Sequence, residues 1–292
     1  MNGTATYRIL GKGFSAVLGL ALMAGGASAQ ISPKAPTQID IYCSGVALNK
    51  PLHNDAYVIS GEDSIYRVTY NAGDLVYINR GSNQGVKVGD EFDVTRPISN
   101  PQPVQWFAWQ NQLIRAMGQM YADIGRIHVL SVQPKVSTAR VTFSCEQMYR
   151  GDLIQPFVPR PSPPYPIVAF DAFAPPSGKK TAMVVTTKGY GEGAAQGYTV
   201  YVNLGSAQGV QIGDYIRVFR YQGESAEAPY QTRGNAYKMY GFGSTPVAYQ
   251  WNDLPRQIIG EGVVIRVGEN SASVYLSYSQ SAVFPGDYIE IQ

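Results

Sequence analysis

The sequence predicts an all-β protein made of two tandem, small, β-barrel-like domains, joined by a proline-rich linker and carrying one short helix in the first inserted loop. Three observations predict this class. Residues 73–96 recur as residues 197–220, with 13 of 24 positions identical and no gap. Each copy contains two stretches in which apolar and polar residues alternate, the period of a half-buried strand. Glycine, tyrosine and proline number 31, 21 and 19, and charged residues are 15% of the chain, against about a quarter in typical domains.

The duplicated segment reads GDLVYINRGSNQGVKVGDEFDVTR in the first copy and GYTVYVNLGSAQGVQIGDYIRVFR in the second. The alternating residues expected to face a core are Val76, Ile78, Phe92, Val94, Val200, Val202, Ile216 and Val218. The glycines at which we expect the chain to reverse are Gly81, Gly85, Gly205 and Gly209, because glycine adopts positive φ without steric cost. Gly-Asp pairs make the next reversal, and we interpret them as turn chemistry rather than as a metal or ligand site.

Residues 1–29 have the features of an export signal. Arg8 and Lys12 supply the positive charge, an apolar stretch follows, and Ala27-Ser28-Ala29 forms a small-residue cleavage site. The apolar stretch is shorter than the roughly 20 residues that a membrane-spanning helix needs. We therefore expect residues 30–292 to be exported to the periplasm or the cell surface without an integral membrane segment. A net charge of +2 is too small to indicate a nucleic acid or an anionic membrane as partner.

The remainder divides into three parts. Residues 30–155 are predicted to form the first domain with an N-terminal strand, and residues 181–292 the second. Between them, residues 156–180 contain eight prolines, which predicts an extended and fairly stiff linker. The apolar residues 167–173 interrupt this linker, and we expect them to dock on one of the domains.

The chain has two cysteines, Cys43 and Cys145. We expect them on strands 39–43 and 139–145, the first and last strands of the first domain. In an oxidising compartment an even count favours a disulfide. Closing a loop of about 100 residues contributes up to about 4.7 kcal/mol in the chain-entropy description. No Cys-x-x-Cys pair is present, so the sequence gives little support to a redox-active centre.

An inserted loop follows each duplicated segment. In the first loop, 97–122, the spacing of Leu113, Ile114 and Met117 predicts one short amphipathic helix. The second loop, 221–256, is longer and rich in aromatic residues. The residues of this loop that we predict to bind a partner protein or a glycan are Tyr230, Arg233, Tyr237, Tyr240, Phe242, Tyr249 and Trp251. Such rings suit a protein contact or a sugar-stacking face, or else they fold inward and cap the barrel.

The sequence predicts no catalytic residues, no metal site and no cofactor, so we expect a protein that is not an enzyme. His53 and His128 are the only histidines, and no paired His or Cys spacing supports zinc. No Gly-x-Ser-x-Gly nucleophile motif occurs. Carboxylates scattered over turns leave a glycosidase pair as the open alternative.

The pattern Val-Tyr-Ile-Asn-x-Gly-Ser-x-x-Gly-Val-x-x-Gly-Asp-x-Phe-x-Val resembles the C-terminal domain of the flagellar assembly protein T family. The resemblance covers residues 56–155 and 182–292. It implies a periplasmic, non-enzymatic β-domain used in assembly, with no catalytic residues to carry over. We therefore expect an exported scaffold or assembly protein of the bacterial cell envelope that binds a protein partner through loops of its β-domains. The alternative is a module that binds peptidoglycan or another polysaccharide through residues 230–251.

Overall fold

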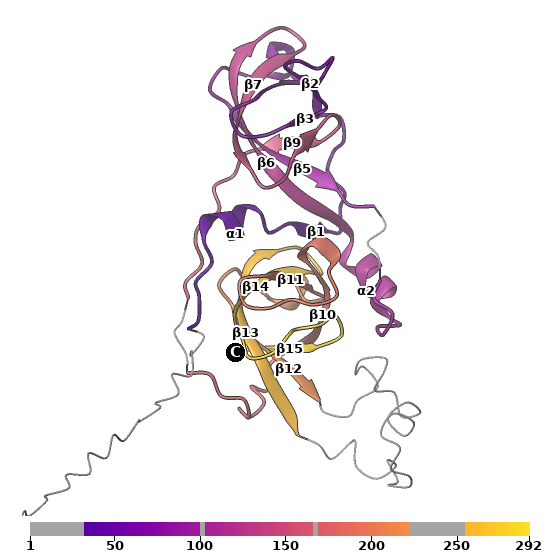
Figure 1. The fold of residues 1–292 in the computed structure, drawn as a ribbon, viewed down its shortest axis with the longest axis vertical. Coiled ribbons are helices and arrows are strands. Elements are labelled where there is room, and N and C mark those ends of the chain that lie inside the picture. The colour runs from indigo at the N-terminus through magenta and orange to yellow at the C-terminus, as the bar shows by residue number, and fades with distance from the viewer. Residues whose placement is uncertain (1–31, 100–102, 166–168, 222–254) are drawn as a thin grey trace, which may run out of the picture. The chain divides into compact units, whose positions relative to one another are not determined.

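The two copies of the duplicated segment lie in two separate antiparallel sheets, as the computed structural model shows (Figure 1). The structure describes residues 32–99, 103–165, 169–221 and 255–292. Most of the regular structure in these ranges is β-strand, so the all-β prediction is confirmed. The proline-rich stretch lies between the last strand of the first sheet and the first strand of the second.

The first sheet is curled and nearly closed. Its seven strands are β1 (Val46–Leu48), β2 (Val58–Gly61), β4 (Leu75–Ile78), β5 (Glu91–Pro97), β6 (Gln119–Val132), β7 (Ser137–Ser144) and β9 (Leu153–Pro156). They follow the order β2-β4-β7-β6-β5-β9, and β1 pairs with β6. A bridge between Tyr57 and Leu153 brings the two outer strands together. Beside this sheet, β3 (Thr69–Tyr70) pairs with β8 (Met148–Tyr149).

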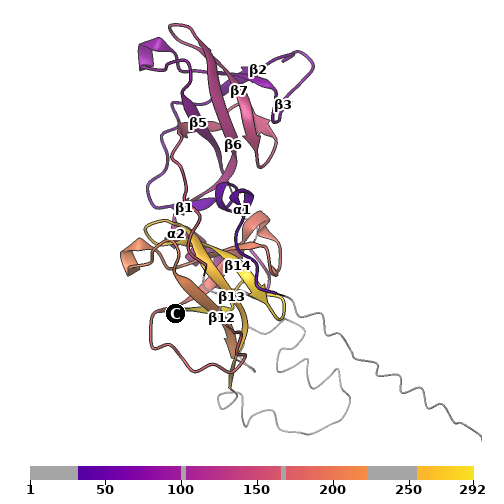
Figure 2. The same cartoon turned by 90° about the vertical axis from the view of Figure 1, so that its left-hand side faces the viewer.

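The second sheet is a closed barrel (Figure 2). Its strands, in order around the barrel, are β10 (Thr181–Thr187), β11 (Thr199–Val202), β14 (Ala272–Ser279), β13 (Arg256–Val267), β12 (Tyr215–Tyr221) and β15 (Tyr288–Ile291). Pairing of β10 with β15, for example Ala182 opposite Ile289, closes the ring. The two copies therefore share one strand order, and the second completes the closure that the first reaches only by a bridge.

Each sheet surrounds its own apolar core, built from the alternating positions. Of the eight predicted core residues, those fully buried are Val76, Ile78, Val94, Val200, Val202, Ile216 and Val218. Phe92 is only partly buried and packs against the edge of the first core. The period-2 pattern therefore located the inward faces of these strands correctly.

The predicted helix is present as α2 (Gln110–Met117), with Ile114 and Met117 buried. A second helix, α1 (Gln38–Tyr42), lies where we expected a strand, so that prediction is wrong. Thr37 and Asp40 explain the difference, because the Thr37 main-chain N–H donates to the Asp40 carboxylate at 2.8 Å and together they form a capping box. This local cap favours a helical turn over the extended form that the alternation suggested.

The duplicated glycines serve two different purposes. Gly85 and Gly209 have φ of 83° and 84° and end the short 3₁₀ turns η1 (Ser82–Gln84) and η3 (Ser206–Gln208), as expected of reversals. Gly81 has φ of −140° and Gly205 has −143°, so the predicted positive φ is wrong for this pair. A Cβ on Gly81 would lie 2.2 Å from the Gln133 carbonyl oxygen. Glycine is needed there for close backbone approach.

The Gly-Asp turns hold their carboxylates as predicted. Asp90 accepts a hydrogen bond from the Lys87 main-chain N–H at 2.8 Å, and Asp214 accepts one from Gln211 at 2.9 Å. Two later aspartates of the same kind also bind the arginine that ends each duplicated segment. Arg96 donates Nε and Nη2 to Asp152, and Arg220 does the same to Asp287, at 2.6 to 2.8 Å. This bidentate pair joins the last strand to the duplicated segment in both copies.

We expect Asp287→Asn to lower the free energy of unfolding by about 1–2 kcal/mol, because it removes one charge-assisted bond to Arg220 while keeping the volume. Asp152→Asn in the first copy should behave alike. Urea denaturation of both variants measures the effect. A loss below about 0.5 kcal/mol in both would show that these pairs do not stabilise the sheets.

Candidate functional site

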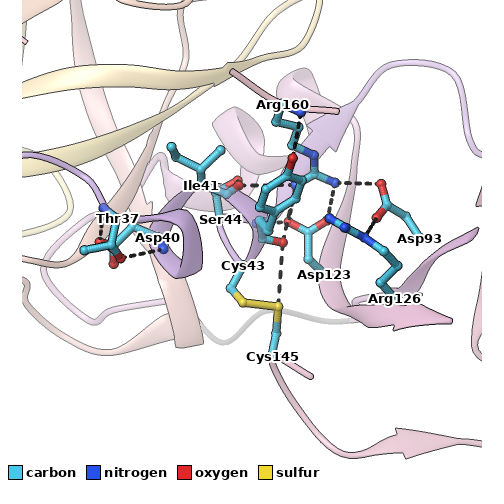
Figure 3. Close-up of a disulfide and its surroundings, with 12 residues drawn as sticks. Thr37, Asp40, Ile41, Cys43, Ser44, Asp93, Asp123, Arg126, Cys145 and Arg160 are labelled. Carbon is cyan, nitrogen blue, oxygen red and sulfur yellow. Dashed lines mark hydrogen bonds and ion pairs between the residues drawn. A yellow bond between two sulfur atoms is a disulfide. The ribbon is translucent and has the colours of Figure 1, made fainter. Parts of the chain in front are cut away.

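The seven predicted loop residues are Tyr230, Arg233, Tyr237, Tyr240, Phe242, Tyr249 and Trp251, and they all lie outside the described residues. Their binding role stays a prediction. The other predicted pair is in place, because Cys43 and Cys145 form a disulfide with a Cα–Cα distance of 5.5 Å (Figure 3). Cys43 caps helix α1 and Cys145 follows β7, so the bond joins a helix end to a strand end rather than two strands.

Residues of the first copy cover one side of the second barrel, the outer face of β10 and β11. Gln110 of α2 donates Nε2 to the Val185 carbonyl at 2.8 Å, and Trp106 donates Nε1 to the Pro285 carbonyl at 3.2 Å. The apolar part of this contact consists of Ala47, Ile114, Met117 and Met120 from the first copy and Val185 and Tyr201 from the second. We call Val185, Tyr201, Phe284 and Pro285 the covered docking face.

The stretch that contains β1 completes this junction through its main chain. The Tyr201 hydroxyl donates to the Ser44 carbonyl at 2.8 Å, and the Ser273 hydroxyl donates to the Gly45 carbonyl at 2.8 Å. Burial raises the pKa of Tyr201, so its hydroxyl stays protonated and remains a donor. Side chains of the second copy therefore bind main-chain carbonyls of the first.

A buried carboxylate ties three segments together at the same junction. Asp123 of β6 accepts from Arg266 of β13 at 2.7 and 2.9 Å and from Arg160 of the proline-rich stretch at 3.1 Å. The Gly45 main-chain N–H donates to it at 2.8 Å. Figure 3 shows Arg160 beside Asp123 near the disulfide. Burial opposes ionisation, but the two arginines outweigh it, and the pKa of Asp123 is lowered.

The first copy has a counterpart of the covered docking face. In each copy, one residue of the first barrel strand has no partner on the neighbouring strand. This residue is Ile59 in β2 and Val185 in β10, so the two are counterparts. The residue after the skipped one pairs with Tyr77 in the first copy and with Tyr201 in the second, so these two tyrosines are also counterparts.

The turn before the last strand gives a second pair of counterparts, Tyr149 and Phe284. The guanidinium carbon of Arg96 lies 4.5 Å from the centroid of the Tyr149 ring, and that of Arg220 lies 5.2 Å from the Phe284 ring. Matching contacts thus fix the correspondence at both ends of the face.

The position of Ile59 is open in the first copy, and the equivalent position is covered in the second. Val185 is 0% exposed, whereas Ile59 is 38% exposed. Tyr149 is 39% exposed, and the neighbouring loop presents Ile65 and Tyr66 at 88% and 89%. This loop lies beside Tyr149 because β3, which follows it, pairs with β8. We call Ile59, Ile65, Tyr66 and Tyr149 the open docking face. Large exposed apolar side chains are enriched at interaction sites.

A groove of about 750 Å³ lies at the first sheet near Phe92. Its lining includes His53 and the ion pair between Asp55 and Arg80. In the second copy the position of Arg80 is taken by Leu204, which is buried in the core. Phe92 lines this groove, so part of its side chain stays exposed.

Within the described ranges, no group of three or more His, Cys, Asp or Glu side chains is placed to hold a metal ion. No helix in the part of the chain that the structure describes is long and apolar enough to cross a membrane.

The docking faces were missed by sequence reasoning. The outward position of Ile59 follows from the alternation around Val58, but nothing in the pattern shows that Val185 is covered. The signal that could have found the open face is the apolar run Ile65-Tyr66 in the connection between β2 and β3, where apolar residues are unexpected. Among known proteins, no family model matches this chain, and no curated protein matches it either.

Proposed function

We propose that this protein is an exported, non-enzymatic scaffold or assembly protein of the bacterial cell envelope that binds a protein partner through the open docking face. One observation carries the proposal. On the first copy Ile59 is exposed together with Ile65, Tyr66 and Tyr149, whereas folded polypeptide fully covers Val185, the counterpart of Ile59, on the second copy. Because polypeptide covers the counterpart, a protein is the class of partner that suits this face.

Two further features support the proposal. The disulfide suits an oxidising compartment outside the cytoplasm. The open docking face is also preorganised, since Ile59 and Tyr149 belong to or adjoin paired strands, and little conformational entropy is lost when such a surface binds. The resemblance to the flagellar assembly protein T domain implies an assembly role and rests on the turn motif.

Site-specific photo-crosslinking in cells tests the proposal. A benzophenone amino acid replaces Tyr66 or Tyr149, and the matched control replaces Tyr198, which is 57% exposed on the second barrel. We expect protein adducts at Tyr66 and Tyr149 and none at Tyr198, with the partner identified by mass spectrometry. Equal adducts at all three positions, or none at the two face positions, would contradict a protein-binding face.

The polysaccharide alternative makes a different prediction. If the aromatic loop binds glycan, the wild-type protein sediments with purified cell wall, and Tyr240→Ala and Trp251→Ala remain in the supernatant. If the scaffold proposal holds, none of the three proteins sediments with cell wall that has been stripped of protein.

A further inference from the structure

We infer that the partner on the open docking face is a second copy of this chain, joined head to tail. The inference rests on the proposed function and names its partner. The fold already contains a surface that fits a docking face, because the end of the first copy, with α2 and β1, sits on the covered face of the second. Since the sequence is duplicated, the second copy has a corresponding end, and nothing in the described residues covers the counterpart face on the first.

The corresponding end of the second copy is built on the same plan. Asp123 in β6 and Ile258 in β13 are equivalent positions near the start of these long strands, because each pairs with the same position of its duplicated segment. Extended by two residues, the register that puts Val46 opposite Tyr121 puts Ser44 opposite Asp123. In the second copy, the Ile258 main-chain N–H donates to the Ala172 carbonyl at 2.8 Å. Ala172 therefore lies where Ser44 lies, and the apolar stretch within the proline-rich linker is the counterpart of the stretch leading into β1.

The next residue presents an uncovered aromatic ring. Gly45 follows Ser44 and lies against Tyr201, since a Cβ on Gly45 would meet the Tyr201 hydroxyl at 2.3 Å. Its counterpart, Phe173, is 72% exposed. The end of the second copy thus places a free ring at the point where the first copy meets the docking face. The main chain at Phe173 cannot approach its partner as closely as Gly45 approaches Tyr201, because Phe173 has a side chain. In the junction between molecules, the Phe173 ring therefore packs against Tyr77, the counterpart of Tyr201, and the two main chains lie farther apart.

The two inserted loops share a short sequence pattern. In the first copy, Trp106 closes the stretch Pro103-Val104-Gln105-Trp106 and reaches the covered face. The second copy carries Pro246-Val247-Ala248-Tyr249, with a tyrosine at the place of the tryptophan. The occupant that we assign to the open docking face is the end of the second molecule that carries Phe173.

The junction between two molecules lacks an ion pair that the internal junction has, and it is therefore the weaker of the two. Asp123 pairs with Arg266 across the internal junction. The counterpart of Asp123 in the second copy is Ile258, and the counterpart of Arg266 in the first copy is Ser131. Neither residue carries a charge. The contact between molecules lacks this ion pair, so it is reversible and depends on concentration. Because the two surfaces differ, the contact is heterologous and produces a ring or an open chain rather than a symmetric dimer.

Two variants of the purified protein test the inference. Ile59→Asp disables the face and Phe173→Asp disables the opposite end; both side chains are outside the cores, and circular dichroism checks folding. Val158→Asp, at another exposed position, is the matched control. Sedimentation velocity over rising concentration measures mass. We expect wild type and Val158→Asp to grow beyond a dimer, each single variant to stay monomeric, and their equimolar mixture to stop at a dimer.

The dimer in the mixture is decisive because each variant retains one working surface, and together they form one junction only. Wild type that stays monomeric at every concentration overturns the inference, and so does assembly that neither variant impairs. If wild type stays monomeric while Tyr66 still crosslinks to another envelope protein, the proposed function stands and only the second copy as partner is rejected.

Discussion

Replacing both cysteines with alanine is expected to lower the free energy of unfolding by about 4 kcal/mol. The disulfide spans 102 residues, and closing a loop of about that length removes much of the unfolded chain's entropy. Cys43 is buried, and alanine there introduces no unpaired polar group. Denaturation of the variant and of the wild-type protein, each with and without reductant, measures the effect.

The reductant supplies the control for this prediction. It should destabilise the wild-type protein about as much as the double substitution does, and it should leave the Cys43→Ala/Cys145→Ala protein unchanged. Because Cys43 directly precedes Ser44 and Gly45, which contact the second barrel, the junction should loosen as well. A loss below about 1 kcal/mol would show that the helix end is held without the covalent bond.

Replacing Asp123 with alanine is expected to lower the free energy of unfolding by about 3 kcal/mol, the low end of the range for breaking a buried ion pair. The carboxylate is 5% exposed, while its partners Arg160 and Arg266 are 15% and 23% exposed. Removing it takes away the carboxylate that Arg266 binds and leaves Arg160 with its longer contacts, among them Asp93 at 3.4 Å. Glu192→Ala, at an exposed site, is the control and should change stability by no more than about 0.5 kcal/mol.

The same carboxylate predicts a pH dependence. Burial raises the pKa of Asp123, but Arg266 and Arg160 lower it by more, so the pKa in the folded protein lies below the ordinary value of 3.8. A group of this kind stabilises the fold fully above its unfolded pKa, and this stability is lost as pH falls through the folded pKa. The stability difference between wild type and Asp123→Asn should therefore be constant near neutral pH and shrink below about pH 4. A difference that does not change with pH would contradict the ionised pair.

Much of the fold was predictable because the duplication repeats each local signal. The alternation around Val76 and Val200 located two cores, and the spacing of Ile114 and Met117 located α2. The exceptions have local causes. The capping box of Thr37 overrode an apparent strand, and Gly81 is conserved between the copies for close packing rather than for a reversal.

The candidate site was not predictable in the same way. Ile59 and Val185 occupy equivalent outward positions, and alternation describes both as exposed. Whether such a residue is covered depends on a segment far away in the chain, here α2, whose docking position no local pattern encodes. The aromatic loop that did attract notice in the sequence lies outside the described residues, so its part in binding stays a prediction.

Hydroxyl-radical labelling of Tyr66 and Tyr149 tests most directly whether the first copy works through a binding face. The labelling is compared between the dilute purified protein and the protein in its native envelope, with exposed Tyr198 as internal reference. We predict that both tyrosines label strongly in dilute solution and weakly in the envelope, while Tyr198 labels equally in both. Equal labelling of all three tyrosines in both settings would show that nothing covers the face and would contradict the account.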